Sequence, residues 1–216
     1  QASSKGAYYP SKITMELVQL IAEKNNLDTS QVTLSSGSNE ALSAAVVGWG
    51  KNGSILCPAF TYDLHLGYAQ KIGTKVIRVP LDKEMSIDLN ALEDALDDSV
   101  SMVYVCNPNN PTGKTIDGDV LRDFCRIIGK KATVLVDEAY NELTLDPGYS
   151  SMVDLIKEGE NIIVARTFSK LYGMAGMRIG YAMGRSDLIS KVRNHVMAWP
   201  NIVGLAAAHA SYTEED

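Results

Sequence analysis

The sequence predicts an α/β protein with three layers, α/β/α, around a mainly parallel central sheet. Short apolar runs alternate along the chain with segments whose apolar residues recur at helical spacing. The apolar runs lack polar alternation, which is typical of strands that helices bury on both faces. Polar side chains directly follow four of these runs, and ligands of such sheets bind beyond the carboxyl ends of the strands. A single site at that edge is therefore expected.

The elements follow in order along the chain. A first helix is expected where Ile13, Leu17, Leu20 and Ile21 recur at helical spacing, with Ser11 as its cap. Further helices are expected at 40–47, up to about 72, and at 88–96, 120–128, 152–157, 186–198 and 203–211. Strands are expected at 32–34, 54–58, 75–80, 102–106, 133–140, 161–165 and 180–183.

Length and composition describe an ordinary globular chain. Its 216 residues fit one large domain, and 45% are apolar and 21% charged. A net charge of −6 without basic runs argues against nucleic acid or an anionic membrane surface as a partner. Apolar runs stay short of the roughly 18 residues of a membrane span. Three widely spaced cysteines, Cys57, Cys106 and Cys125, are expected to be buried thiols. The three histidines are too scattered for a metal site. We expect the sequence, which starts at Gln1 without a signal-peptide core, to be part of a longer protein.

Lys170 stands out because it lies in a glycine-rich loop between two apolar runs, with Arg178 eight positions later. A lysine amine in this setting can form a Schiff base with a carbonyl cofactor. Arg178 could then bind an anionic group such as a phosphate. The alternative is a surface lysine beside a salt-bridged arginine. This stretch alone leaves both interpretations open.

A turn of small residues, Ser35-Ser-Gly-Ser-Asn-Glu, joins the expected strand at 32–34 to the next helix. Free N–H groups and the helix dipole point the same way at such a junction, so it can bind an anion. Many turns of this kind bind nothing.

Gly113-Lys-Thr, followed by the strand that ends at Asp137, suggests a nucleotide-hydrolase alternative. A phosphate loop requires a glycine five residues before Gly-Lys-Thr, and that position is Pro108. Pro111 lies in the same loop, and prolines lack the N–H groups that bind phosphate. We therefore set the hydrolase aside.

Asp137 ends an apolar strand, where a carboxylate is costly unless it is paired. A cationic heteroaromatic nitrogen is one possible partner. Tyr140 could reach the same ligand, and Asn110 on the neighbouring loop could donate to a phenolate oxygen. A capping role for Asp137 and core packing for Tyr140 are the simpler alternatives. Their occurrence together with Lys170 and Arg178 at one edge makes those alternatives improbable.

These motifs together resemble a known family. Asn110-Pro-Thr-Gly, Asp137-Glu-Ala-Tyr140 and Ser169-Lys170 followed by Arg178 look like the signature of fold-type I pyridoxal-phosphate aminotransferases, class I/II. Within these the chain most resembles the histidinol-phosphate aminotransferase branch, over essentially its whole length.

The resemblance implies pyridoxal 5'-phosphate as cofactor and assigns three catalytic residues. Lys170 would be the Schiff-base lysine and proton carrier, and Asp137 would pair with the pyridinium nitrogen. Tyr140, together with Asn110, would hydrogen-bond the ring oxygen.

The same resemblance implies the remaining cofactor contacts. The phosphate would be held by Ser38, Asn39, Thr167 and Arg178. Phe60 matches the aromatic residue that stacks on the cofactor, with Tyr62 as the alternative. Tyr9 matches a residue that reaches the phosphate of a neighbouring subunit, which implies a homodimer.

Members of the family are about twice the size of a typical domain. We expect residues 1–216 to form the pyridoxal-phosphate-binding large domain, with the N-terminal arm and the small C-terminal domain absent. The arginine that grips the substrate carboxylate belongs to that small domain, so no residue here takes its role. The full protein would move an amino group between an amino acid, such as histidinol phosphate, and a 2-oxo acid.

Three other functions remain open on this basis. A decarboxylase or a carbon–sulfur lyase of the same fold would use the same residues, and a truncated chain could be a non-catalytic module. The expected location is the cytoplasm, with periplasmic export as the alternative if a signal was removed.

Overall fold

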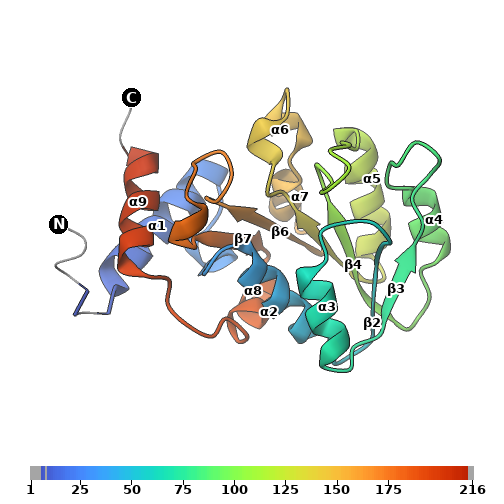
Figure 1. The fold of residues 1–216 in the computed structure, drawn as a ribbon, viewed down its shortest axis with the longest axis horizontal. Helices are drawn as coiled ribbons and strands as arrows, with labels where there is room; N and C mark the ends of the chain where they lie inside the picture. The colour runs from blue at the N-terminus through green and yellow to red at the C-terminus, as the bar shows by residue number, and fades with distance from the viewer. Residues whose placement is uncertain (1–5, 8, 214–216) are drawn as a thin grey trace.

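The computed structural model describes residues 6, 7 and 9–213 of the chain (Figure 1). Within them, seven strands form one sheet in the order β1-β7-β6-β5-β4-β2-β3. The strands are β1 (Val32–Ser35), β2 (Ser54–Pro58), β3 (Val76–Val79), β4 (Val100–Cys106), β5 (Thr133–Asp137), β6 (Ile162–Thr167) and β7 (Gly180–Gly184).

The sheet is mainly parallel, as the sequence predicts. Only β7 is reversed: it pairs antiparallel with both β6 and β1, while all other neighbours pair in parallel. Because β7 lies between them, β1 runs in the same direction as β6. Asp137 is level with Cys106 on one side and with Ala165 on the other. The carboxyl ends of β4, β5 and β6 therefore meet at one edge.

Helices cover both faces of the sheet (Figure 1). One core cluster joins the sheet to α1, α4, α5, α7 and α9, and the other joins it to α2, α3 and α8. The three predicted layers are confirmed. In the described part of the chain the α-helices are α1 (Ser11–Asn25), α2 (Ser38–Gly50), α3 (Leu64–Lys71), α4 (Leu89–Asp94), α5 (Gly118–Gly129), α6 (Pro147–Ser150), α7 (Val153–Lys157), α8 (Ser186–Arg193) and α9 (Ile202–Thr213). The 3-10 helices there are η2 (Thr29–Gln31), η3 (Asn141–Leu143) and η4 (Ala175–Met177).

Several predicted boundaries are wrong. Ser11 is the first helical residue and not the cap, because Pro10 takes the cap position and makes no side-chain bond there. The strand expected at 133–140 ends at Asp137, since the backbone then turns into η3. The stretch between the strand expected at 133–140 and the helix expected at 152–157 contains the short helix α6, where Asp146 accepts a hydrogen bond from the N–H of Tyr149. The helix expected at 186–198 ends at Arg193.

The predicted burial of the cysteines is confirmed: Cys57, Cys106 and Cys125 are buried free thiols. Among the described residues, no helix is both long and apolar enough to cross a membrane.

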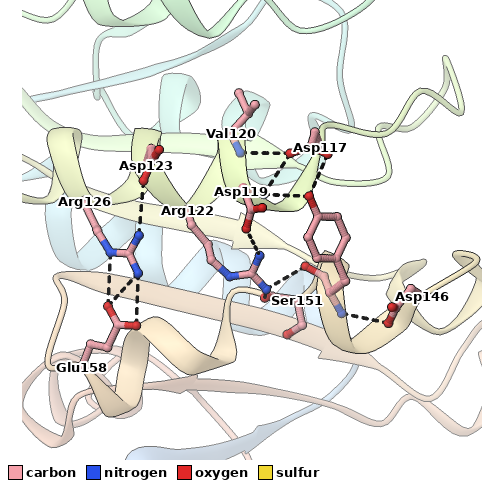
Figure 2. Close-up of polar contacts among 10 residues, drawn as sticks. Asp117, Asp119, Val120, Arg122, Asp123, Arg126, Asp146, Ser151 and Glu158 are labelled. Carbon is pink, nitrogen blue, oxygen red and sulfur yellow. Dashed lines mark hydrogen bonds and ion pairs between the residues drawn. The ribbon is translucent and has the colours of Figure 1, made fainter.

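Polar contacts fasten the segment after β5 to helix α5, as Figure 2 shows. Asp117 accepts hydrogen bonds from the first N–H groups of α5 and from the hydroxyl of Tyr149, 2.8 Å away. Arg122 donates to the carbonyls of Tyr149 and Ser151, at 2.7 and 3.2 Å. Ser151 in turn donates to the fully buried Glu138. These hydrogen bonds fix the path of the chain in the segment that follows Asp137.

Glu138 also anchors the end of β6. Its carboxylate forms an ion pair with Arg166 at 2.8 Å and accepts a hydrogen bond from the N–H of Met152 at 2.6 Å. Arg166 immediately precedes Thr167, so this buried pair holds the ends of β5 and β6 together.

Candidate active site

A cavity of about 170 Å³ lies at the carboxyl edge of the sheet. Five chain segments reach it. Four are those predicted from the sequence, the start of α2 after β1 and the loops that follow β4, β5 and β6, and the fifth is the loop between β2 and α3. Most of the residues predicted from the sequence line it, namely Ser38, Asn39, Asn110, Asp137, Tyr140, Thr167, Lys170 and Arg178. The sequence prediction that these segments converge is confirmed. The roles of the individual residues stay predictions.

Asp137 is the acidic centre of the cavity and is 2% exposed. Its carboxylate accepts hydrogen bonds from the N–H of Ala139 at 3.2 Å and from the hydroxyl of Tyr104 at 3.3 Å. Burial raises the pKa of Asp137 to about 6, although these two donors and the charge of Lys170 act in the opposite direction. A buried carboxylate of this kind is stabilised by a cation that approaches it from the cavity.

Lys170 is exposed at the opening of the loop that joins β6 to β7. Its ammonium lies 4.9 Å from the centroid of the Tyr140 ring, within the range of a cation–π contact. The lysine and the tyrosine therefore flank the same side of the cavity, near the end of β5.

Arg178 lies against the first turn of α2. It is the C-cap of η4 in the left-handed conformation, with φ 54° and ψ 56°. Its guanidinium donates to the carbonyls of Ala175 at 2.9 Å and Ser36 at 3.3 Å. The free N–H groups at the start of α2 and this guanidinium together favour an anion.

Two glycines make this approach possible. A Cβ at Gly37 would collide with the guanidinium of Arg178, and a Cβ at Gly180 would collide with the backbone of Ser38. Gly37 also has φ 82° and ψ 156°, a backbone region that other residues rarely occupy. The Thr167 hydroxyl lies near the same site and donates to the carbonyl of Ile179 at 3.3 Å.

The aromatic side of the cavity is formed by Tyr62. Its hydroxyl donates to Oδ1 of Asn39 at 3.3 Å, and the His65 ring packs behind it with centroids 6.0 Å apart. Phe60, the first choice from the sequence, is 49% exposed and does not line the cavity. The geometry favours Tyr62 for the stacking role, because Tyr62 lines the cavity and Phe60 does not.

Tyr9 lies away from the cavity, 89% exposed, with its ring 6.2 Å from that of Trp199. Its contact with a neighbouring subunit stays a prediction.

Two residues near Asp137 were missed at the sequence level. Tyr104 is the one aromatic residue of the buried strand β4, and its hydroxyl could have indicated a buried polar partner. His65 is fully buried, contacts Tyr104 edge-on at 4.3 Å, and has no hydrogen-bond partner among the described residues for either ring nitrogen. Burial lowers the pKa of His65 to about 3, so this imidazole is neutral.

Comparison with known proteins places the chain in a family. The sequence profile for aminotransferase class I and II matches residues 1–214. The chain is 36% identical over 193 residues to histidinol-phosphate aminotransferase 1 of Bacillus cereus, covering 88% of this chain and 51% of that protein. It is 34% identical over 215 residues to the histidinol-phosphate aminotransferase of Brevibacillus brevis, covering 97% and 58%.

A solved structure gives the same result. The histidinol-phosphate aminotransferase of Sinorhizobium meliloti, in complex with pyridoxal-5'-phosphate, superimposes with a TM-score of 0.87 at 26% identity, covering 99% of this chain and 59% of that one. The chain thus spans about half the length of the curated relatives it matches. By profile, sequence identity and fold, it belongs to the class I and II aminotransferases.

Proposed function

We propose that this chain is the cofactor-binding large domain of a pyridoxal-phosphate-dependent aminotransferase. The observation that carries the proposal is the meeting of Asp137, Lys170 and Arg178 at one cavity, with Arg178 against the start of α2. A buried acid, an accessible amine and an anion site are the groups that a phosphorylated pyridine aldehyde requires.

The residues of the cavity fit this cofactor. Asp137 is buried with a raised pKa and would gain most from a cationic ring nitrogen. Gly37 and Gly180 leave the space in which Arg178 meets the N-terminus of α2, and a phosphate is the anion suited to that geometry. The histidinol-phosphate aminotransferase of Sinorhizobium meliloti, which has the same fold, was solved in complex with pyridoxal-5'-phosphate.

When bound, pyridoxal phosphate supplies an electron-accepting ring for chemistry at the substrate Cα. Lys170 would hold the cofactor aldehyde through its amine and carry the proton at Cα. Asp137 would keep the ring nitrogen protonated, and Asn110 and Tyr140 would donate to the ring oxygen. Tyr62 would stack on the ring and exclude water from that face. The phosphate would be bound by the residues predicted from the sequence, Ser38, Asn39, Thr167 and Arg178.

The activity of the whole protein is part of the proposal. We infer transfer of an amino group between an amino acid and a 2-oxo acid. Histidinol phosphate, an amino alcohol ester that would take the place of the amino acid as donor, is the first donor to assay, because the relatives named above are histidinol-phosphate aminotransferases. The carboxylate-binding arginine would lie in a second domain outside residues 1–216. We place the protein in the cytoplasm, an environment that suits its free thiols.

A homodimer is also proposed. Tyr9, Met197 and Trp199 are 89%, 92% and 54% exposed, and Tyr9 packs beside Trp199. An apolar surface of this kind supports contact with a second copy of the chain. Light scattering coupled to size exclusion would give twice the monomer mass for the full-length protein. A monomer mass at micromolar concentration would refute this part.

The test of the cofactor site uses absorption spectroscopy on the full-length protein. Wild type titrated with pyridoxal phosphate should develop a visible band, and borohydride should remove the band and fix the label to Lys170. Lys170→Ala should give neither, whereas Lys83→Ala, at an exposed lysine remote from the cavity, should behave as wild type. A wild-type protein without a band would refute the proposal. With an amino acid as donor, transfer of its amino group to an added 2-oxo acid without release of carbon dioxide would distinguish transamination from decarboxylation.

A further inference from the structure

Asn109 joins two loops of the cavity, although it does not line the cavity itself. It is 2% exposed and lies between β4 and α5. Its Oδ1 accepts a hydrogen bond from the hydroxyl of Thr61 at 2.8 Å, and its Nδ2 donates to the carbonyl of Phe60 at 3.1 Å and to the hydroxyl of Thr112 at 3.0 Å. The first two of these bonds cross to the loop that joins β2 to α3.

Each of the joined loops carries one wall of the cavity. Tyr62 directly follows Thr61, and Asn110 directly follows Asn109. The Tyr62 ring is restrained at its tip by Asn39 and from behind by His65. Its backbone is restrained by the bonds to Asn109. The separation of the Tyr62 wall from the Asn110 wall therefore depends on this one buried amide.

We propose that Asn109, with Thr61 as its partner, is a positioning residue that sets the separation of Tyr62 and Asn110, the residues that would stack on the cofactor ring and donate to its oxygen. The inference rests on the proposed function, because it concerns the same cavity. Asn109 acts through Tyr62 and Asn110 and does not touch the ring. Its loss widens the cavity and weakens the stacking of Tyr62, while Lys170 and Arg178 keep their places.

A simple structural anchor would behave differently. Asn107, in the same loop, is also buried, and its Oδ1 accepts a hydrogen bond from the N–H of Ile116 at 2.8 Å. That bond closes the loop on itself and does not reach the Tyr62 loop. Asn109 differs because its side chain fastens a second loop, and the amide offers both the acceptor and the two donors that the junction uses.

The proposal is tested by cofactor affinity and by the visible circular dichroism of bound pyridoxal phosphate, measured on the full-length protein. Thr61→Val should raise the Kd for pyridoxal phosphate about fivefold, because the buried amide of Asn109 loses one hydrogen-bond partner. Asn109→Ala should raise it about tenfold or more, because all the hydrogen bonds of that amide are lost. Both should reduce the dichroism per bound cofactor, since the ring lies less firmly oriented. Thr61→Ser, which keeps the hydroxyl, should restore both values.

Two comparisons separate positioning from folding. In a Tyr62→Leu background, Asn109→Ala should change the Kd by less than about twofold, because coupled residues are not additive. Thr133→Val removes a buried hydroxyl at the amino end of β5, away from the cavity, where Thr133 donates a hydrogen bond to Asn161 at 2.9 Å. It should lower the unfolding midpoint as Thr61→Val does, yet leave Kd and dichroism unchanged.

Additive effects of Asn109→Ala and Tyr62→Leu, or equal Kd changes for the Thr61 and Thr133 variants, would overturn the inference. These outcomes are distinct from a failure of the proposed function, in which wild type itself binds no cofactor.

Discussion

Replacement of Gly37 by alanine tests the anion site most directly. The new Cβ would occupy the position of the Arg178 guanidinium, so the arginine must leave the start of α2. A displaced guanidinium loses charge-assisted bonds to the phosphate of about 1.5 to 3 kcal/mol. At 1.4 kcal/mol per tenfold, the Kd for pyridoxal phosphate should rise about 10- to 100-fold. Fluorescence titration of the full-length protein measures this change.

Gly37→Ala should also lower the free energy of unfolding, by about 1 to 3 kcal/mol, because its φ and ψ suit glycine alone. Two other glycines separate this backbone cost from the loss of Arg178. Gly73 has φ 93° but open space around its Cβ position, so Gly73→Ala should cost about 1 kcal/mol of stability and leave the Kd unchanged. Gly67 lies in α3 with open space and ordinary φ, and Gly67→Ala should stabilise the protein by about 0.5 to 1 kcal/mol. If Gly37→Ala binds the cofactor within about twofold of wild type, the anion site is not where we assign it.

Three further predictions concern stability in urea. Glu138→Gln leaves the buried Arg166 unpaired and should cost about 3 to 5 kcal/mol, and a loss below about 1 would contradict the role of this ion pair. In the folded protein the pKa of Asp137 is raised from 3.8 to about 6, so between these pH values the folded state binds more protons than the unfolded state. The free energy of unfolding of the cofactor-free protein should therefore fall by up to about 3 kcal/mol as the pH rises from 4 to 7. Asp137→Asn should abolish that decline, and an unchanged pH profile would refute it. As the N-cap of α4, Asp88 accepts a hydrogen bond from the N–H of Ala91. Asp88→Ala should therefore lower the free energy of unfolding by about 1 kcal/mol, whereas Asn90→Ala, at an exposed position of the same helix, should lower it by less than about 0.5 kcal/mol.

The order of strands and helices could be predicted because buried strands and amphipathic helices leave different patterns in the sequence. The direction of β7 could not. Gly180-Tyr-Ala-Met has the same apolar character as a parallel strand, and only the short connection from β6 hints that the chain turns back. The short helix α6 was missed because a single hydrogen bond, from the N–H of Tyr149 to the side chain of Asp146, caps it.

The candidate site was predictable to the extent that its residues form local motifs. Lys170, Arg178 and Asp137 stand in short, specific sequences at strand ends. Contacts between single side chains that are far apart in the sequence produce no recognisable motif. The preference for Tyr62 over Phe60 depends on a loop conformation that Asn109 fixes, 48 residues from Thr61. The bond from Tyr104 to Asp137 likewise depends on the pairing of β4 with β5.

The reversed strand β7 has a consequence for how the protein acquires its site. The bond from Arg178 to Ser36 joins residues 142 positions apart, and β1 reaches the sheet only by pairing with β7. Contacts between such distant segments form late, because a long loop must close before they stabilise anything. During synthesis, β1 must therefore wait until Gly184 has been made. We expect cofactor capture to be the last event of folding and its release to be the earliest sign that this edge has opened.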